Sequence, residues 1–150
     1  MIAIQYLLLS RISSNELEID LEYLKKGYAV NVGNPHLIFF VDEVRIDPLV
    51  KNSKQIEKLG YFPEGVNVSV VQLIDENTIK IITHERGVGI TEACGSGACA
   101  SVCVAHKKKM VSEKVCVEMI GGKLNIELTN NNHILMIGKA TKVFEGIIEA

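Results

Sequence analysis

The chain has 150 residues, which is long enough for one domain with its own hydrophobic core. Its composition, 47% hydrophobic and 23% charged, is that of a soluble folded protein, and a formal net charge of −2 provides no basic field for nucleic acid or an anionic membrane surface. Because the sequence has neither an apolar run of the roughly 20 residues that span a bilayer nor a secretory signal at its start, we expect a cytoplasmic protein whose four cysteines are reduced thiols.

The first half of the chain is predicted to form short strands and one surface helix. Apolar runs predict strands at 2–9, 29–32 and 36–41, the last two flanking the turn Gly33-Asn34-Pro35. A helix follows, with Asp47 as its expected N-cap, Pro48 in its first position and Gly60 after its C-terminus. One apolar stripe, made of Leu49, Val50, Ile56 and Leu59, indicates that this helix lies on the surface of the fold.

Two further strands and a second helix are predicted in the middle of the chain. The strands span 66–74 and 78–83, the first because valines at 66, 68 and 70 alternate with Asn67 and Ser69. The helix spans 97–110, and its first nine residues are small or apolar on every side. A helix that is apolar all round must be buried all round. The three lysines at 107–109 then complement the dipole at its C-terminal end.

The last third of the chain is again predicted to consist of strands. They span 115–120, 124–128, 134–137 and 141–148, separated by glycine and asparagine turns. Short strands joined by turns favour antiparallel pairing, and small helix residues let strands approach closely. The expected fold class is therefore α+β, with an antiparallel sheet curled into a barrel-like layer around a central buried helix.

The clearest chemical signal is Cys94, followed by Gly95-Ser96-Gly97 at the start of the buried helix. Glycines leave backbone N–H groups uncovered, and at a helix start these groups form a site for a carboxylate or a phosphate. The same field would lower the pKa of Cys94 and favour its thiolate. The alternative is a small buried hydrophobic residue beside a plain turn. The glycine pattern together with the helix start favours a nucleophilic or acid–base thiol.

Cys99, Cys103 and His106 lie on one face of the same helix. A metal site would need a fourth ligand, and Cys94 lies well around the helix from this face. We therefore interpret these three side chains as core packing.

Two other groups of polar residues have open interpretations. Glu85-Arg86 forms either a solvated ion pair at a strand end or a grip on the ammonium and carboxylate of a zwitterion, since arginine binds carboxylate through paired hydrogen bonds. In Gly33-Asn34-Pro35-His36, Asn-Pro is a common turn, and His36 is either a packed strand residue or part of a site.

Four of these segments together resemble one family. Gly33-Asn34-Pro35-His36, Gly65-Val66-Asn67-Val68, Glu85-Arg86-Gly87-Val88-Gly89 and the segment from Ala93 to Ala100 occur in the order and approximate spacing of diaminopimelate epimerase. The resemblance runs from about Val30 to Ala150. Four separated motifs in one order are much more specific than any one of them.

The resemblance implies a cofactor-independent epimerase, without a metal, that inverts one α-carbon of diaminopimelate. It would interconvert the LL and meso forms and so serve lysine and peptidoglycan precursor synthesis. Two cysteines act from opposite faces in this family, one as thiolate and the other as thiol, and Cys94 matches one of them. The substrate-binding residues implied by the resemblance are Asn34, Asn67, Glu85, Arg86, Gly95 and Ser96.

Each of these residues has an implied role. The Gly95 and Ser96 amides would bind the reacting α-carboxylate. Asn34, Asn67 and Arg86 would hold the distal end of the substrate. Glu85 would bind the distal ammonium, and His36 would support the site near the reacting centre.

The resemblance also implies that the chain corresponds to about half of such an enzyme, because the family's second cysteine lies in a Cys-Gly-Asn-Gly motif that this sequence lacks. We expect 30–140 to form the C-terminal epimerase domain, 141–150 to be a terminal strand that belongs with an N-terminal domain, and 1–29 to be a lead-in segment. The expected partners are diaminopimelate and an N-terminal domain with the second cysteine, or a second copy of the chain in a homodimer. The alternatives are a related amino-acid racemase or isomerase of the same fold, and a non-catalytic remnant or binding domain.

Overall fold

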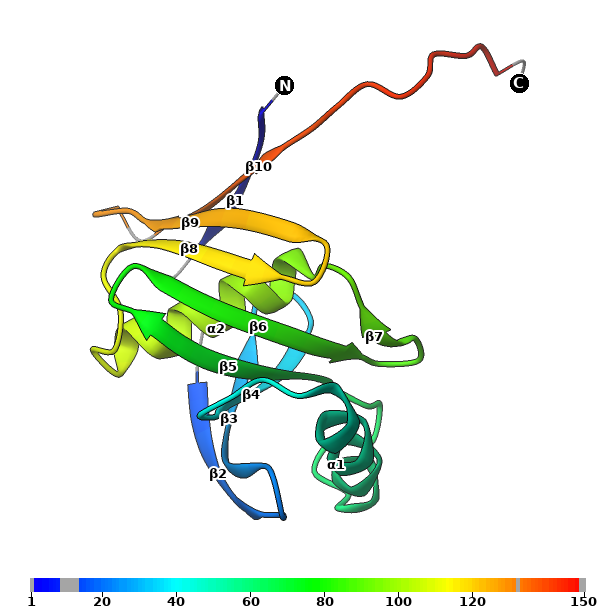
Figure 1. Cartoon of the computed structure of the whole chain (residues 1–150), viewed down its shortest axis with the longest axis vertical. Helices are drawn as coiled ribbons and strands as arrows, with labels where there is room; N and C mark the ends of the chain where they lie inside the picture. The colour runs from blue at the N-terminus through cyan, green and yellow to red at the C-terminus, as the bar shows by residue number, and fades with distance from the viewer. Residues whose placement is uncertain (1, 9–13, 132, 149–150) are drawn as a thin grey trace.

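The computed structural model describes residues 2–8, 14–131 and 133–148 (Figure 1). Its elements in chain order are β1 (Ile2–Leu8), β2 (Ser14–Asp20), β3 (Lys25–Asn31), β4 (Pro35–Phe40), α1 (Ile46–Lys58), β5 (Asn67–Asp75), β6 (Thr78–Glu85), β7 (Gly89–Thr91), α2 (Gly95–Lys107), β8 (Lys114–Met119), β9 (Gly122–Leu128) and β10 (His133–Lys139). Neither described helix is long and apolar enough to cross a bilayer.

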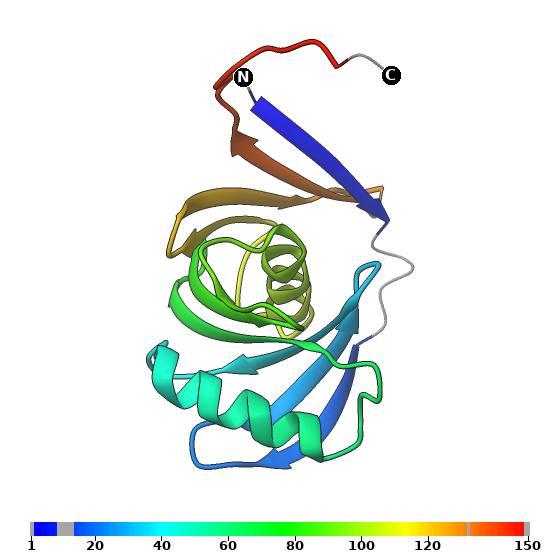
Figure 2. The same cartoon turned by 90° about the vertical axis from the view of Figure 1, so that its right-hand side faces the viewer.

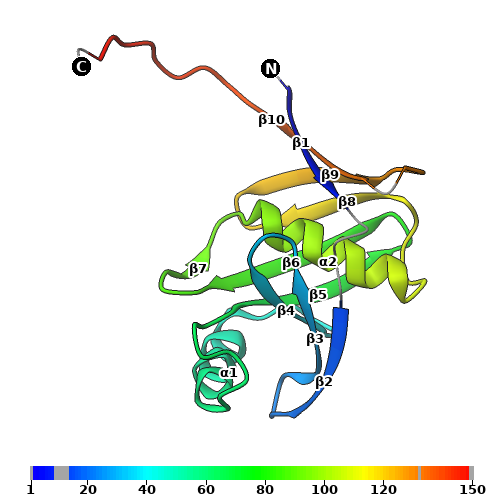
Figure 3. The ribbon, with the colours of Figure 1, turned by 180° about the vertical axis from the view of Figure 1, so that it is seen from behind.

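The strands form one ten-stranded sheet in the order β1-β10-β9-β8-β6-β5-β4-β3-β2, with β7 paired to β6. Figure 2 shows this sheet curled around α2, and Figure 3 shows α2 lying across its concave side. The predicted fold class, α+β with a curled sheet around a central helix, is confirmed. Among the described residues, β1 and β2 stand at the two ends of the strand order, so the sheet wraps the helix without closing.

Two of the strand pairings are parallel, whereas we expected an antiparallel sheet. β4 pairs with β5 in parallel, and so does β6 with β8. In each case a helix lies between the two strands in the chain, α1 in the first and α2 in the second. A strand that follows such a crossover runs in the same direction as its partner, which a short turn does not permit.

The central helix α2 is buried on every side, as the sequence indicates. All residues from Gly97 to Ala105 are buried, and they form the larger of two hydrophobic clusters together with strands on both sides. Short side chains at these positions allow the curled sheet to approach the helix backbone.

The surface helix α1 lies on the outer side of the sheet (Figure 2). Leu49 and Ile56 are buried there in the second hydrophobic cluster, whereas Leu59, expected in the same stripe, is 46% exposed. Because α1 covers one face of β5 and α2 the other, residues 67–71 are all buried and not alternately so. The predicted strand is present, but the alternation of its residue types is for this reason not an alternation of burial.

The ends of α1 differ in one respect from the prediction. Arg45 is the N-cap, without a side-chain hydrogen bond, and Asp47 and Pro48 lie inside the first turn. Proline is tolerated there because the first-turn amides have no acceptor in the helix, and an acidic side chain suits the positive helix end. Gly60 does follow the C-cap, with a φ of 75°, as expected.

The two chain termini differ most from the sequence-based picture. β2 and the first part of β3 were not predicted, because β2 is largely polar and buries mainly Ile19. The strand predicted at 141–148 is absent: this segment continues β10 without a partner strand among the described residues and leads away from the sheet (Figure 1). Residue 9 of the first predicted strand and residues 149–150 lie outside the described residues.

Candidate active site

Cys94 is the N-cap of α2, and its side chain is turned back onto the first turn of the helix. Its backbone is extended, its Sγ accepts a hydrogen bond from the Gly97 amide at 3.3 Å, and its carbonyl oxygen accepts one from the Ala98 amide at 2.9 Å. The helix therefore begins two residues earlier than predicted, at Gly95. As the first two amides of the helix, those of Gly95 and Ser96 have no acceptor within it. A thiol thus stands beside two available backbone donors.

Gly97 allows α2 to approach the sheet at this point. A Cβ on Gly97 would lie 3.0 Å from Thr83 Oγ1, 3.1 Å from Cys94 Sγ and 3.3 Å from Ser69 Oγ. These distances are shorter than ordinary van der Waals contacts. The glycine is therefore required by close packing and not by an unusual backbone angle.

Two segments that lie about 60 residues apart in the sequence meet at Ser96. His36 Nε2 lies 3.0 Å from Ser96 Oγ and 3.1 Å from Asn34 Oδ1, and Asn34 Nδ2 donates to Ser96 Oγ at 3.4 Å. Ser96 Oγ in turn lies 3.6 Å from Cys94 Sγ. The pairing of β3 with β4 positions Asn34 and His36 at one end of the sheet, directly beside the start of α2.

His36 is fully buried and remains neutral at physiological pH. Burial lowers the pKa of its imidazole to about 4, although the negative charge of Glu85 acts in the opposite direction. Its Nδ1 has no hydrogen-bond partner among the described residues. Of the two open interpretations, His36 is thus both a packed strand residue and a member of the cluster around Ser96.

Glu85 is the last residue of β6 and Arg86 follows it, but among the described residues the two do not form an ion pair with each other. Glu85 Oε1 accepts a hydrogen bond from Thr91 Oγ1 at 2.6 Å, which fixes the carboxylate against β7. The Arg86 guanidinium donates from Nη1 to the Glu64 carbonyl oxygen at 2.8 Å. The two charged groups therefore point to different partners and are separately available to a ligand.

Asn67 links this pair to the histidine. Its Oδ1 accepts a hydrogen bond from the Arg86 amide at 2.8 Å, and its backbone lies opposite His36 in the parallel pairing of β4 and β5. Gly65 adopts a φ of 80°, and a Cβ there would lie 2.6 Å from Arg86 Cδ. Glycine at this turn thus lets the arginine stem pack against the backbone.

The electrostatics of Cys94 differ from the sequence-based expectation. Burial raises the pKa of its thiol, and the nearby Glu85 carboxylate raises it further, while the Ser96 hydroxyl and the Gly97 amide lower it. Cys94 is only 7% exposed, so desolvation of the thiolate outweighs the favourable helix terminus. The predicted lowering of this pKa is wrong, and Cys94 rests as a neutral thiol.

Cys99, Cys103 and His106 contribute to packing, as the helix pattern indicates. Both cysteines are buried, and burial raises the pKa of each thiol to about 12. His106 Nδ1 lies 3.3 Å from the Val111 carbonyl oxygen. Within the described part of the chain, no three ligand-type side chains are grouped as a metal would need.

The sequence did not single out four residues that touch this site. Thr91 holds Glu85, Ser69 and Thr83 lie under Gly97, and Met136 Sδ would be 2.8 Å from a Cβ on Gly95. Their residue types carry no motif by which they could have been found.

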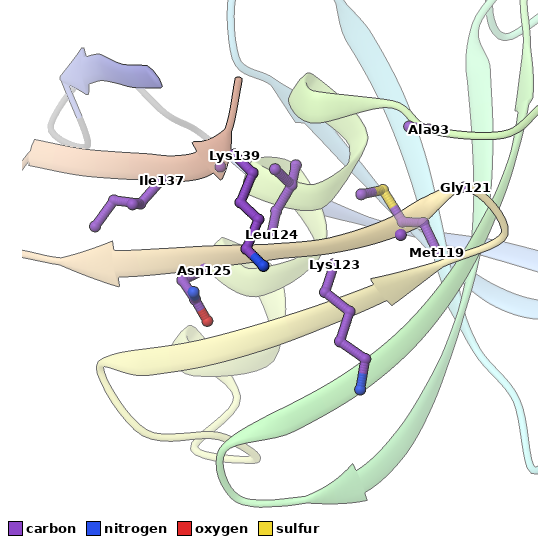
Figure 4. A pocket seen from close by; sticks show the side chains of 10 residues that line it. Ala93, Met119, Gly121, Lys123, Leu124, Asn125, Ile137 and Lys139 are labelled. Carbon is purple, nitrogen blue, oxygen red and sulfur yellow. The ribbon is translucent and has the colours of Figure 1, made fainter. Parts of the chain in front are cut away.

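A hollow of about 790 Å³ is lined by Ala93, next to the thiol residue, but not by Cys94 itself. Figure 4 shows its lining residues, including Lys123 and Lys139, on β9 and β10. Cys94 itself lines a much smaller hollow with Thr83, and the two hollows share Ala93 and Met119. The thiol therefore lies at the edge of an open concavity, covered on its inner side.

Comparisons with known proteins identify relatives of this chain in a single family. The model of the family described as diaminopimelate epimerase matches residues 28–143. A diaminopimelate epimerase of Erythrobacter litoralis is 43% identical over 84% of this chain and 47% of its own length, and one of Acetivibrio thermocellus is 47% identical over 89% and 48%. The chain thus spans about half the length of the curated relatives it matches.

Solved structures show the same fold at low sequence identity. A hydroxyproline epimerase from Agrobacterium vitis has a TM-score of 0.62 and 16% identity, and covers 89% of this chain and 48% of its own. A probable proline racemase from Agrobacterium radiobacter has a TM-score of 0.61 and 15% identity, with 84% and 46% coverage. The curled sheet around a buried helix is therefore the architecture of one half of such proteins.

Proposed function

The chain belongs to the diaminopimelate epimerase family, and from that premise we propose that it supplies one catalytic half of an epimerase that inverts an α-carbon of diaminopimelate. The observation that carries the proposal is the meeting of Cys94 with Asn34, His36, Glu85 and Ser96 at the start of α2. We propose the activity of a complete diaminopimelate epimerase only for this half together with a second one.

We propose that the α-carboxylate of the substrate binds at the start of α2. The Gly95 and Ser96 amides have no acceptor within the helix, and the positive end of the helix dipole favours an anion there. As the α-proton leaves, negative charge spreads from the α-carbon onto this carboxylate. Preorganised donors at that position stabilise the charge more than water does.

Cys94 is proposed to deliver the proton. Because burial and Glu85 raise the pKa of Cys94, the sulfur begins the reaction as a thiol. A base on the opposite face of the substrate removes the α-proton, and the Cys94 S–H bond breaks as its proton passes to the carbanion. The sulfur is left as thiolate, so Cys94 is the base when the reaction runs in reverse. Inversion needs no movement of the substrate.

The polar residues on the other side of the site are proposed to select the substrate. Arg86 keeps further guanidinium donors beyond the one that the Glu64 carbonyl oxygen accepts. The Asn67 side chain contacts the Arg86 backbone amide, and the Asn34 amide lies beside Ser96. Glu85 is proposed to bind an ammonium group. The ammonium is the one at the distal end of the substrate, and the Thr91 hydroxyl holds the Glu85 carboxylate in place for it.

Inversion requires an acid or base on the face of the substrate opposite Cys94. We propose that another polypeptide region supplies this group. We propose an N-terminal domain that carries the second cysteine, with a second copy of this chain as the alternative source. The segment 141–148 is proposed to complete that domain: Val143, Phe144, Ile147 and Ile148 are almost fully exposed, as unpaired apolar side chains that await a partner would be.

A complementation assay tests the proposal. We expect the chain alone to convert LL-diaminopimelate to the meso form at a negligible rate, and a mixture with the N-terminal half of a relative to restore conversion. Cys94→Ala should abolish that rescue, and Ser101→Ala, a buried helix residue remote from the thiol, should retain it. Full turnover by the chain alone as a monomer would contradict the half-site argument. Rescue of proline racemisation in place of diaminopimelate conversion would favour a racemase of the same fold.

A further inference from the structure

The rows of side chains that face α2 change character beside Cys94. On β6, Ile79 and Ile81 face the helix and are fully buried, and on β5 so does Val71. The next residue of each row is a hydroxyl, Ser69 on β5 and Thr83 on β6. The apolar side chains with which β5 and β6 face α2 thus give way to one polar pair.

The two hydroxyls form a cross-strand pair. Ser69 and Thr83 are directly opposite in the strand register, their oxygens are 2.8 Å apart, and both residues are buried. A valine pair would suit the strands and the core at least as well, because burying hydroxyls costs free energy that one shared hydrogen bond offsets only partly. Packing alone does not explain why this position is polar.

The pair and the thiol surround a single point. Thr83 Oγ1, Cys94 Sγ and Ser69 Oγ all lie within 3.3 Å of the position where a Gly97 Cβ would stand. Thr83 and Cys94 also line the same small hollow, which is too narrow for a water molecule. Solvent therefore cannot hydrate this side of the sulfur.

The pair holds two hydroxyl protons, and its mutual hydrogen bond uses one of them. In the described structure the sulfur is bonded by the Gly97 amide and the Ser96 hydroxyl, and not by this pair. A thiol needs no further donor, whereas a thiolate that water cannot reach does. The second proton of the pair is a donor beside the sulfur that no hydrogen bond in the described structure uses.

We propose that Ser69 and Thr83 are positioning residues that donate a hydrogen bond to Cys94 when its sulfur is ionised. The inference rests on the proposed acid–base role of Cys94 and goes beyond the family resemblance, since neither residue lies in the motifs that carry it. The donation stabilises the thiolate left after the proton has been delivered. It also leaves the resting thiol undisturbed.

The test measures ionisation of Cys94 in the full chain without substrate. Cys116 is partly exposed, so a Cys116→Ser background is used, and carboxamidomethylation of the Cys94 peptide by iodoacetamide is followed by mass spectrometry from neutral to alkaline pH. The titratable groups facing Cys94 are Glu85 from β6, His36 from β4 behind Ser96, and Cys99 from α2, and none is altered.

Thr83→Val keeps the shape of the side chain and removes the hydroxyl. We expect it to raise the ionisation midpoint of Cys94 by about one unit, which slows alkylation about tenfold below the midpoint. Thr83→Ser should restore the original midpoint, and Ser69→Ala should shift it in the same direction as Thr83→Val. The matched control is Ser101→Ala, which removes a buried hydroxyl from α2 itself and should leave the midpoint unchanged.

An unshifted midpoint in both Thr83→Val and Ser69→Ala would overturn the proposal, as would an equal shift in Ser101→Ala. Should Thr83→Val fail to fold in a urea titration, Ser69→Ala, the smaller change, decides. A shifted midpoint together with an inactive complementation mixture would refute the epimerase proposal and leave this inference standing. An active mixture with an unshifted midpoint would do the reverse.

Discussion

The two glycines of the first turn of α2 give a matched pair of alanine substitutions for which we expect different free energies of unfolding. Gly95 and Gly97 are two residues apart in the same helix, neither has a positive φ, and alanine favours a helix over glycine by up to about 1 kcal/mol at each. The substitutions therefore differ mainly in what the new methyl group meets.

At Gly95 the methyl group meets the tip of a flexible side chain. The nearest atoms are Met136 Sδ at 2.8 Å and Cε at 3.2 Å, and a methionine can change rotamer at little cost. At Gly97 it meets Thr83 Oγ1, Cys94 Sγ and Ser69 Oγ, all short side chains held by hydrogen bonds. Such overpacking costs about 1–3 kcal/mol.

We therefore expect Gly97→Ala to be less stable than Gly95→Ala by about 1–2 kcal/mol, after the helix preference has cancelled. Urea unfolding of the two variants measures this difference directly. Equal stability, or a more stable Gly97→Ala, would refute the close approach of α2 to β5 and β6 on which the site geometry depends.

Three further outcomes are expected. The pKa of His36 is about 4 in the folded chain and near 6.5 in the unfolded chain, so the unfolded chain binds a proton at a higher pH. The free energy of unfolding should therefore fall by up to about 3 kcal/mol as the pH drops from above 6.5 towards 4. Urea unfolding at a series of pH values should show this fall in the wild type and not in His36→Gln. Leu49→Ala should lower the free energy of unfolding by about 2–5 kcal/mol, because Leu49 of α1 is fully buried, while Leu59→Ala at the C-cap of the same helix should cost well under that. Similar losses would show that α1 is not packed as described. Phe144→Asp should leave the free energy of unfolding of the chain unchanged within about 0.5 kcal/mol, because Phe144 is exposed. The same substitution should weaken binding to the N-terminal half, measured by titration calorimetry. Tyr61→Asp, which changes another exposed aromatic residue, should leave that binding intact.

The parts of the fold that could be predicted depend on local patterns. The buried helix follows from its uninterrupted small and apolar residues, and most strands follow from short apolar runs between turns. The parallel pairings of β4 with β5 and of β6 with β8 could not be predicted, because they depend on how each helix crosses the sheet. The burial of β5 on both faces could not be predicted for the same reason, because it depends on where the two helices cross the sheet.

The candidate site was predictable in its members but not in its electrostatics. The motifs around Asn34, Asn67, Glu85 and Cys94 do lie near one another, because β4 and β5 begin, and β6 ends, at the same end of three neighbouring strands. The helix terminus at Cys94 is visible in the sequence and predicts a lowered pKa for the thiol. The burial of the sulfur and its proximity to the Glu85 carboxylate are not visible in the sequence, and together they raise that pKa.

Transfer of a solvent proton to the α-carbon through Cys94 is the central claim. It is tested most directly by deuterium incorporation from heavy water into diaminopimelate, catalysed by this chain mixed with an N-terminal half. We expect one deuterium at each inverted α-carbon. We also expect this incorporation to be lost in Cys94→Ser, because a serine hydroxyl is far too weak an acid to protonate the α-carbon. Incorporation at the wild-type rate by Cys94→Ser would contradict it.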